Sequence, residues 1–314
     1  MASKSVKKHH SAKNPHQNRH KTNANRNLVR NRTGQNAASK SASRHEQITT
    51  INNKIAPKPP HNGYFIWGRH AVFAALANPE RRVQKIYVVA ESANELERVL
   101  DDLDLRRKAE LPYAQMIDRA RLDALGGVSE KAVHQGIAAT VWPLDPPHFD
   151  MFLDGIKSKL DQGNPETIRL LLLDQISDPR NFGAIMRSAQ AFGVAGIITT
   201  FRNAANENGV LARAASGALD HVPLIRVVNL ARAITQIRYH GFFVAGLAGD
   251  GSTDVSNLRL HKHLAIILGA EGSGLRRLSR DHCDVLVRIN IDNNSESLNV
   301  SNAAAVALYA ASLH

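Results

Sequence analysis

Three short polar segments in the second half of the chain combine residue types that could do chemistry. The first reads DQISDPRNFG from Asp174 to Gly183 and is followed by Arg187. Asp178 and Asn181 could each cap a helix, and Pro179 suits its first turn. Capping does not account for Arg187, which lies six residues after Asn181, so both side chains can share one broad face near the helix start. The segment therefore predicts a helix N-terminus followed by an arginine that capping leaves unexplained.

The second segment, LGAEGSGL from Leu268 to Leu275, predicts a strand that runs into a glycine-rich turn. Its spacing, G-x-x-G-x-G, matches neither the dinucleotide fingerprint nor a Walker loop, which ends in Gly-Lys-Ser/Thr. Glu271 would repel a pyrophosphate, and it suits a hydroxyl or a cation better. The glycines would let the backbone approach a ligand closely. A plain tight turn with a solvated glutamate remains the alternative for this motif taken alone.

The third segment, INIDNNSESLNVSN from Ile289 to Asn302, opens an Ala-rich stretch with helical character. A helix cap preceded by a loop is the simplest interpretation. Ser297, Asn299 and Ser301 are more short polar side chains than one cap needs. The surplus favours a binding loop at a helix N-terminus.

The elements around these segments largely alternate between strand and helix. The predicted strands are 170–174, 196–200, 222–227, 242–247, 264–269 and 285–289, and the predicted helices are 181–192, 209–219, 230–239, 274–281 and 298–313. Runs such as LLLL and LAIIL are apolar on both faces, as a parallel sheet covered by helices requires. The sequence therefore predicts an α/β domain over 168–314, with its polar segments at the edge where open sheets bind ligands.

A smaller α/β unit precedes this domain, over residues 63–142. We predict helices at 67–77 and 93–107 and strands at 85–90 and 133–141. Residues 143–167 contain four prolines and two glycines between Pro143 and Pro165, which indicates a linker.

The charge of the chain is concentrated at its N-terminus. The net charge is +12, and residues 1–60 hold 13 of the 40 basic residues and a single acid, Glu46, so that this segment carries the entire excess. Rich in Asn, Lys, Arg, His and Ser, residues 1–62 cannot bury enough apolar surface to offset the entropy of ordering, and we predict a disordered basic tail. A mitochondrial presequence is also basic, but the Asn and His bias and the missing amphipathic stripe favour the tail.

The remaining composition excludes several classes of protein. The lone cysteine, Cys283, allows no intrachain disulfide and no Cys-based metal site, and it suits a reducing, cytoplasmic setting as a core residue. The 15 histidines are scattered without zinc spacing, so we expect no metal. Apolar runs are too short to span a membrane, and none follows Met1 as a secretory signal would.

Taken together, order and spacing of the three segments resemble the SpoU, or TrmH-type, branch of the SPOUT methyltransferases. The match consists of DP-x-N-x-G-x8-F-G with its Arg, GAEG-x-G-L, and SLNVS. Further likeness, in VHQGI at 133–137, VPLIRV at 222–227 and RRLSRDHCD at 276–284, is to bacterial enzymes that methylate a guanosine ribose in the P-site loop of 23S rRNA. The resemblance covers residues 64–314.

This resemblance implies a trefoil-knotted catalytic domain that binds S-adenosylmethionine in a bent form, largely through backbone groups. It implies a homodimer with the active site near the subunit interface, and a ribosomal-protein-like RNA-binding domain at the N-terminus. By position in the motifs, the cofactor residues would be Leu247, Ala248, Gly249, Gly269, Ile289 and Leu298.

The resemblance also implies catalytic roles. Arg187 would activate the ribose 2′-OH, either as a general base or, since Arg normally stays protonated, by stabilising the developing alkoxide. Asn181 and Glu271 would orient Arg187 or the ribose, and Ser297 and Asn299 would shape the site. Two alternatives remain: the same chemistry on tRNA, and a ribosome-assembly factor that binds RNA without methylating it. The tRNA enzymes usually lack the N-terminal domain, and a pure RNA binder does not need this residue set.

Overall fold

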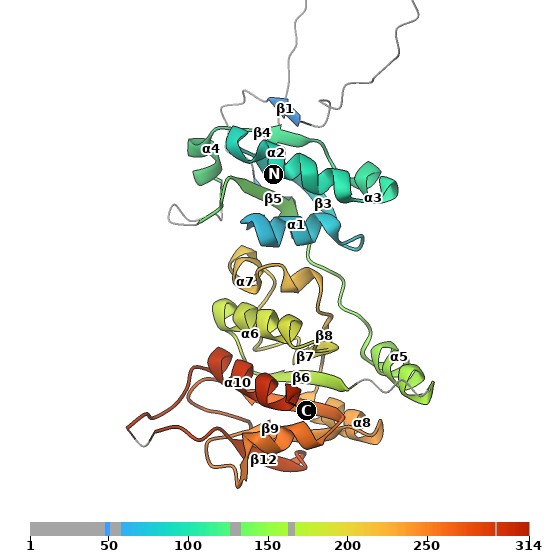
Figure 1. The fold of residues 1–314 in the computed structure, drawn as a ribbon, viewed down its shortest axis with the longest axis vertical. Helices are drawn as coiled ribbons and strands as arrows, with labels where there is room; N and C mark the ends of the chain where they lie inside the picture. The colour runs from blue at the N-terminus through green and yellow to red at the C-terminus, as the bar shows by residue number, and fades with distance from the viewer. Residues whose placement is uncertain (1–47, 51–57, 126–132, 163–166, 293, 314) are drawn as a thin grey trace, which may run out of the picture. The chain divides into compact units, whose positions relative to one another are not determined.

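The computed structural model describes residues 48–50, 58–125, 133–162, 167–292 and 294–313, which form two sheets with their helices (Figure 1). Most of the predicted tail, 1–62, lies outside the described residues. Within it, Ile48–Thr50 forms β1, which pairs in parallel with β4 (Ala114–Met116). Disorder is therefore the wrong prediction for these three residues. In the described ranges no helix is long and apolar enough to cross a bilayer.

The first sheet has the order β1-β4-β3-β5-β2 and mixes parallel with antiparallel pairs. Its other strands are β2 (Tyr64–Trp67), β3 (Val83–Val88) and β5 (Ile137–Val141), and its helices are α1 (Arg69–Ala77), α2 (Ala90–Asp102), α3 (Leu105–Glu110) and α4 (Arg119–Asp123). The helix predicted from Trp67 begins only at Arg69, because Trp67 belongs to β2. The single helix predicted over 93–107 is two helices, since Asp104 caps α3 by accepting from the Arg107 amide.

The second sheet has seven strands, all parallel, in the order β10-β12-β9-β11-β6-β7-β8. The strands are β6 (Ile168–Asp174), β7 (Gly196–Thr200), β8 (Leu224–Val227), β9 (Phe243–Leu247), β10 (Thr253–Asp254), β11 (His263–Gly269) and β12 (Val285–Arg288). All six predicted strands are confirmed to within two residues at each end. The two-residue β10 was not predicted, because two residues carry no periodic signal.

Helices cover both faces of this sheet. On one face lie α6 (Pro179–Ala191), α7 (Gly209–Ala215) with the 3₁₀ turns η1 (Ala218–Asp220) and η2 (Val255–Leu260), and α10 (Val300–Ser312). On the other face lie α5 (Phe149–Asp161) and α8 (Leu230–Tyr239). The short α9 (Arg277–Asp281) contacts α8. The predicted α/β architecture is confirmed, and the apolar runs that suggested it are the strands buried between two helix layers.

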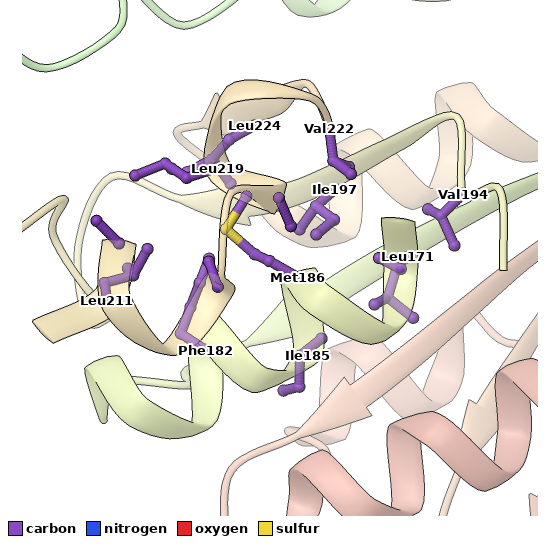
Figure 2. Close-up of a cluster of buried hydrophobic side chains, with 14 of the residues drawn as sticks. Leu171, Phe182, Ile185, Met186, Val194, Ile197, Leu211, Leu219, Val222 and Leu224 are labelled. Atoms are coloured by element: carbon purple, nitrogen blue, oxygen red, sulfur yellow. The ribbon is translucent and has the colours of Figure 1, made fainter. Parts of the chain in front are cut away.

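Helix α6 is the element that connects the core to the polar segments. Figure 2 shows Phe182, Ile185 and Met186 turned from α6 into a cluster with Leu171 of β6 and Leu211 of α7. All five side chains are fully buried, and burying each contributes about 1.5–3 kcal/mol. This packing fixes the rotation of α6 and therefore the direction of its opposite, solvent-facing side.

The segment interpreted as a linker, 143–167, contains helix α5. Its prolines and glycines dominated the sequence interpretation, but Leu153 and Ile156 recur at helical spacing and are buried against the sheet. The helix predicted from Gly274 likewise begins only at Arg277, because the glycines before it form a turn.

Candidate active site

The three polar segments meet at the carboxyl edge of the seven-stranded sheet. Strands β6 and β11 are neighbours, and their last residues, Asp174 and Gly269, are paired. The chain leaves β6 for the start of α6 and leaves β11 for the glycine-rich turn. Because parallel strands end at one edge, residues about 90 positions apart in sequence lie side by side.

The N-terminus of α6 is capped by Asp178 alone. Its carboxylate accepts from the backbone amides of Arg180 and Asn181, at 2.8 and 2.9 Å. The Asn181 side chain is therefore not a cap, contrary to one interpretation of the sequence. Its Nδ2 donates to Oε2 of Glu271 at 3.2 Å, across to the glycine-rich turn.

Asn299 joins these two residues from the third segment. Its Nδ2 donates to Oδ1 of Asn181 at 3.0 Å and lies 3.4 Å from Oε1 of Glu271. Its Oδ1 accepts from the Ser301 amide at 2.9 Å and caps α10. The side-chain oxygen of Asn299 therefore caps α10, and its side-chain nitrogen donates to Asn181. We call Asn181, Glu271 and Asn299 the polar cluster.

The glycines of the second segment shape the turn that carries Glu271. Ala270 and Gly274 exchange two backbone hydrogen bonds, of 3.1 and 2.9 Å, and Gly272 and Gly274 have φ of 81° and 64°, which favour glycine. A Cβ on Gly269 would lie 2.1 Å from the Gly274 carbonyl carbon. Gly269 is therefore required by the turn itself, whereas the sequence had suggested a close approach to a ligand.

A pocket of about 470 Å³ adjoins the polar cluster. Glu271 belongs to the cluster and also lines the pocket. Three loops that follow β9, β11 and β12 form its wall. All six positions that the resemblance assigns to a cofactor lie there, together with Ser297: they are Leu247, Ala248, Gly249, Gly269, Ile289 and Leu298. We call this cavity the loop pocket. The rest of its wall includes the apolar Leu268, Ile291 and Val300 and a second carboxylate, Glu296.

Arg187 and Ser297 stand apart from the polar cluster. Arg187 is on the third turn of α6, exposed, and forms no hydrogen bond or ion pair with any residue in the described ranges. Ser297 lines the loop pocket, and its carbonyl accepts weakly from Ser295 at 3.5 Å. The structure thus brings together three of the five predicted catalytic residues by direct contact.

One buried group at this edge was not given a role by sequence reasoning. Asp174, fully buried at the end of β6, accepts from Ser279 Oγ at 2.6 Å and from Arg276 Nε at 2.6 Å. The Arg276 backbone amide also donates to it, at 3.2 Å. These bonds hold α9 against the strand ends. An ionisable residue closing a strongly apolar strand was the available signal, since a buried carboxylate requires partners.

Comparisons with known proteins agree with this geometry. The model of the SpoU rRNA Methylase family matches residues 169–309, and that of the RNA 2′-O ribose methyltransferase substrate binding domain matches 65–147. A TrmH family tRNA/rRNA methyltransferase of Staphylococcus haemolyticus is 35% identical over 78% of this chain and 93% of its own length. The 23S rRNA (guanosine-2′-O-)-methyltransferase RlmB of Xylella fastidiosa is 37% identical over 79% and 95%, respectively.

Solved structures share the fold. An rRNA methyltransferase from Sinorhizobium meliloti superposes with a TM-score of 0.64, at 19% identity, over 84% of this chain and 97% of its own. The SpoU methyltransferase AviRb from Streptomyces viridochromogenes, in complex with AdoMet, has a TM-score of 0.60 at 21% identity, over 80% and 90%. The fold class predicted from the resemblance is confirmed. By its sequence relatives and its fold, the chain belongs to the SpoU, or TrmH, family of RNA 2′-O-ribose methyltransferases.

Proposed function

We propose that this protein transfers a methyl group from S-adenosylmethionine to the ribose 2′-OH of a guanosine in the P-site loop of 23S rRNA. The observation that carries the proposal is the polar cluster beside the loop pocket, with Glu271 in both. Methyl transfer requires a site for the methyl donor directly beside a site for the ribose hydroxyl, and the loop pocket and the polar cluster are adjacent in this way. The likeness to the Xylella fastidiosa enzyme supports rRNA and guanosine as the substrate.

The loop pocket fits S-adenosylmethionine in size and chemistry. Its volume of about 470 Å³ lies in the usual range of small-molecule sites. Leu247, Leu268, Ile289 and Leu298 offer apolar surface for an adenine ring, and the exposed backbone of the loops offers amides and carbonyls for its polar edges. When bound, the cofactor supplies an electrophilic methyl group whose transfer needs no metal.

The residues of the chain must then make the ribose hydroxyl a nucleophile. Its proton has to leave as the oxygen attacks, and the attacking oxygen has to be held in line with the methyl group. Arg187, exposed and uncommitted to another side chain in the described ranges, is the cation that can stabilise the developing alkoxide or assist proton removal. The polar cluster orients the ribose, because it presents fixed amide and carboxylate groups at the mouth of the pocket.

We further propose that the protein acts as a homodimer. Helix α10 exposes Val306 and Tyr309 and is followed by the exposed Leu313, and the rings of Tyr309 and Phe192 meet in an edge-type contact. We take this apolar surface, toward the C-terminal ends of α6 and α10, as the contact with the second copy. Sedimentation equilibrium on the full chain should give twice the monomer mass. The Tyr309→Glu variant should give a mass closer to that of the monomer. A monomeric wild type would contradict this part of the proposal.

Ribose-methylation mapping of 23S rRNA and tRNA from cells lacking the protein tests the function. We expect one 23S rRNA position to lose its methylation and to regain it with the wild-type gene. The Arg187→Ala gene should not restore it. Loss at a tRNA position would instead identify a tRNA enzyme, and unchanged methylation everywhere would identify an RNA-binding assembly factor.

A further inference from the structure

The loop after β7 holds an aromatic ring in solvent by backbone hydrogen bonds. Phe201 is 54% exposed, and its amide donates to the Val227 carbonyl of β8 at 3.2 Å. Arg226 donates from Nη2 to the Ala205 carbonyl at 2.8 Å, and Thr200 Oγ1 bonds the Arg202 carbonyl at 2.5 Å. The loop is thus fixed at both ends. A single exposed ring is ordinary, but contiguous exposed apolar side chains mark interaction sites, and further exposed apolar residues lie close to Phe201.

This loop lies directly beside the first polar segment, just before the start of α6. The Ala205 amide donates to the Ile176 carbonyl at 3.0 Å, and Ile176 lies two residues before the cap of α6. Strand β7 is also the neighbour of β6 in the sheet, so their ends are about 5 Å apart. Nucleotides that flank a ribose held at the polar cluster would therefore reach Phe201.

Beyond Phe201 the same edge carries a hollow of about 380 Å³ that is lined by apolar side chains and by two arginines. Thr200, Val228 and Leu278 line it, and Val228 and Leu278 are 89% and 52% exposed. Arg276 and Arg277 line it from α9 and its cap. The buried Asp174 is already neutralised by Arg276, and the exposed Asp281 pairs with Arg277 at 3.3 Å. Arg202, next to Phe201, is exposed and adds a further cation.

An exposed ring next to an exposed arginine fits single-stranded RNA. Unstacked bases stack on aromatic side chains, and arginines contact the phosphates beside them. A stable protein–protein interface uses about 20–30 residues a side, far more than this small surface offers. We name Phe201, Arg202, Val228, Arg277 and Leu278 the edge strip. We propose that the edge strip binds the nucleotides adjacent to the methylated ribose, with Phe201 stacked on a neighbouring base. This inference rests on the proposed function, and it identifies the path of the substrate over β7 and β8.

Steady-state methylation of a 23S rRNA fragment by the full-chain enzyme tests the inference. Phe201→Ala should raise the KM for RNA about tenfold, the effect typical of losing one base–aromatic stack. Its kcat at saturating RNA and its Kd for S-adenosylmethionine should stay near wild type. Phe201→Leu keeps the apolar volume without the π face and should show the same rise in KM. Phe201→Tyr keeps the ring and should restore the KM.

A matched control is Tyr239→Ala. Tyr239 is 87% exposed at the end of α8, which leads to the opposite edge of the sheet, so its loss should leave the KM for RNA unchanged. An unchanged KM in both Phe201→Ala and Phe201→Leu would overturn the inference, as would an equal rise in Tyr239→Ala. A wild-type enzyme that does not methylate the fragment, or any RNA offered, would overturn the proposed function instead. The two failures are therefore distinguishable.

Discussion

The loop pocket and the polar cluster adjoin each other but are built in different ways. The pocket is formed by apolar side chains and by the backbone of three loops, including Gly249 and Gly269. The polar cluster is formed by side-chain hydrogen bonds between Asn181, Glu271 and Asn299. The pocket should keep its affinity for a ligand when side-chain chemistry changes and lose it when volume is added. The polar cluster should lose its function when a single hydrogen-bond donor is removed, even if the side-chain volume is unchanged.

Arg187 is part of neither the loop pocket nor the polar cluster. Its replacement should lower the rate of methyl transfer more than any other change proposed below. Arg187→Ala should lower kcat about 100- to 1,000-fold, as expected when a charge that stabilises a developing alkoxide is removed. The Arg187 side chain is exposed and makes no polar contact in the described part of the chain. The free energy of unfolding and the affinity for S-adenosylmethionine should therefore stay the same in the variant. Tritium transfer to RNA, with calorimetry of S-adenosylmethionine binding, measures both. Near-normal turnover would remove Arg187 from the mechanism.

Asn299→Asp separates the two roles of Asn299. An aspartate caps a helix about as well as asparagine, so α10 should keep its cap. The new carboxylate cannot donate to Asn181 and lies against Glu271, so kcat should fall about tenfold or more.

Asn299→Ala is the matched comparison, because it also loses the cap. It should lower the free energy of unfolding by about 1 kcal/mol more than Asn299→Asp does. Thermal denaturation measures the capping role of Asn299, and kcat measures its role in the active site. If Asn299→Asp kept full activity, Asn299 would be a cap only.

Gly249→Val tests the pocket by adding volume without disturbing the loop. A Cβ at Gly249 meets no atom within 4 Å, in contrast to Gly269, where it would break the turn. We expect affinity for S-adenosylmethionine to fall about tenfold, because branched methyl groups enter a site of tight contacts. Calorimetry provides the measurement.

The control for this variant is Gly155→Val. Gly155, in α5, also has open space around its Cβ but does not line the pocket. Its replacement should leave affinity unchanged. Equal affinities in the two variants would place the cofactor elsewhere.

The basic tail should have the smallest effect, on RNA binding alone. Residues 1–60 carry the entire excess charge of +12, so their deletion should weaken RNA affinity at low salt and flatten its salt dependence. The methylated nucleotide should not change, since phosphate contacts carry little sequence information. RNA affinity across a salt series, full-length against truncated, measures the slope. Identical slopes would show that the tail does not engage RNA.

Much of the fold follows from local patterns. Six of the seven strands of the second sheet could be predicted because each is a short, largely apolar run that helices cover. Helix α8 matches its prediction at both ends, since Leu230, Ile234 and Ile237 mark one face. Helix α5 was missed because nearby prolines and glycines hid its buried residues, and β2 was missed because four residues merged with the helix that follows.

The sequence by itself determined which residue types end the strands and begin the helices, and their motif spacing indicated the family. Only the tertiary structure decided how they are used. It assigned the cap of α6 to Asp178 and left Asn181 for the site, and it gave Asn299 both tasks. The physical reason is that a cap is a contact across two or three residues, which spacing can reveal. The bonds of the polar cluster cross 28, 90 and 118 residues of sequence, and those of Asn181 exist only once β6 and β11 are paired.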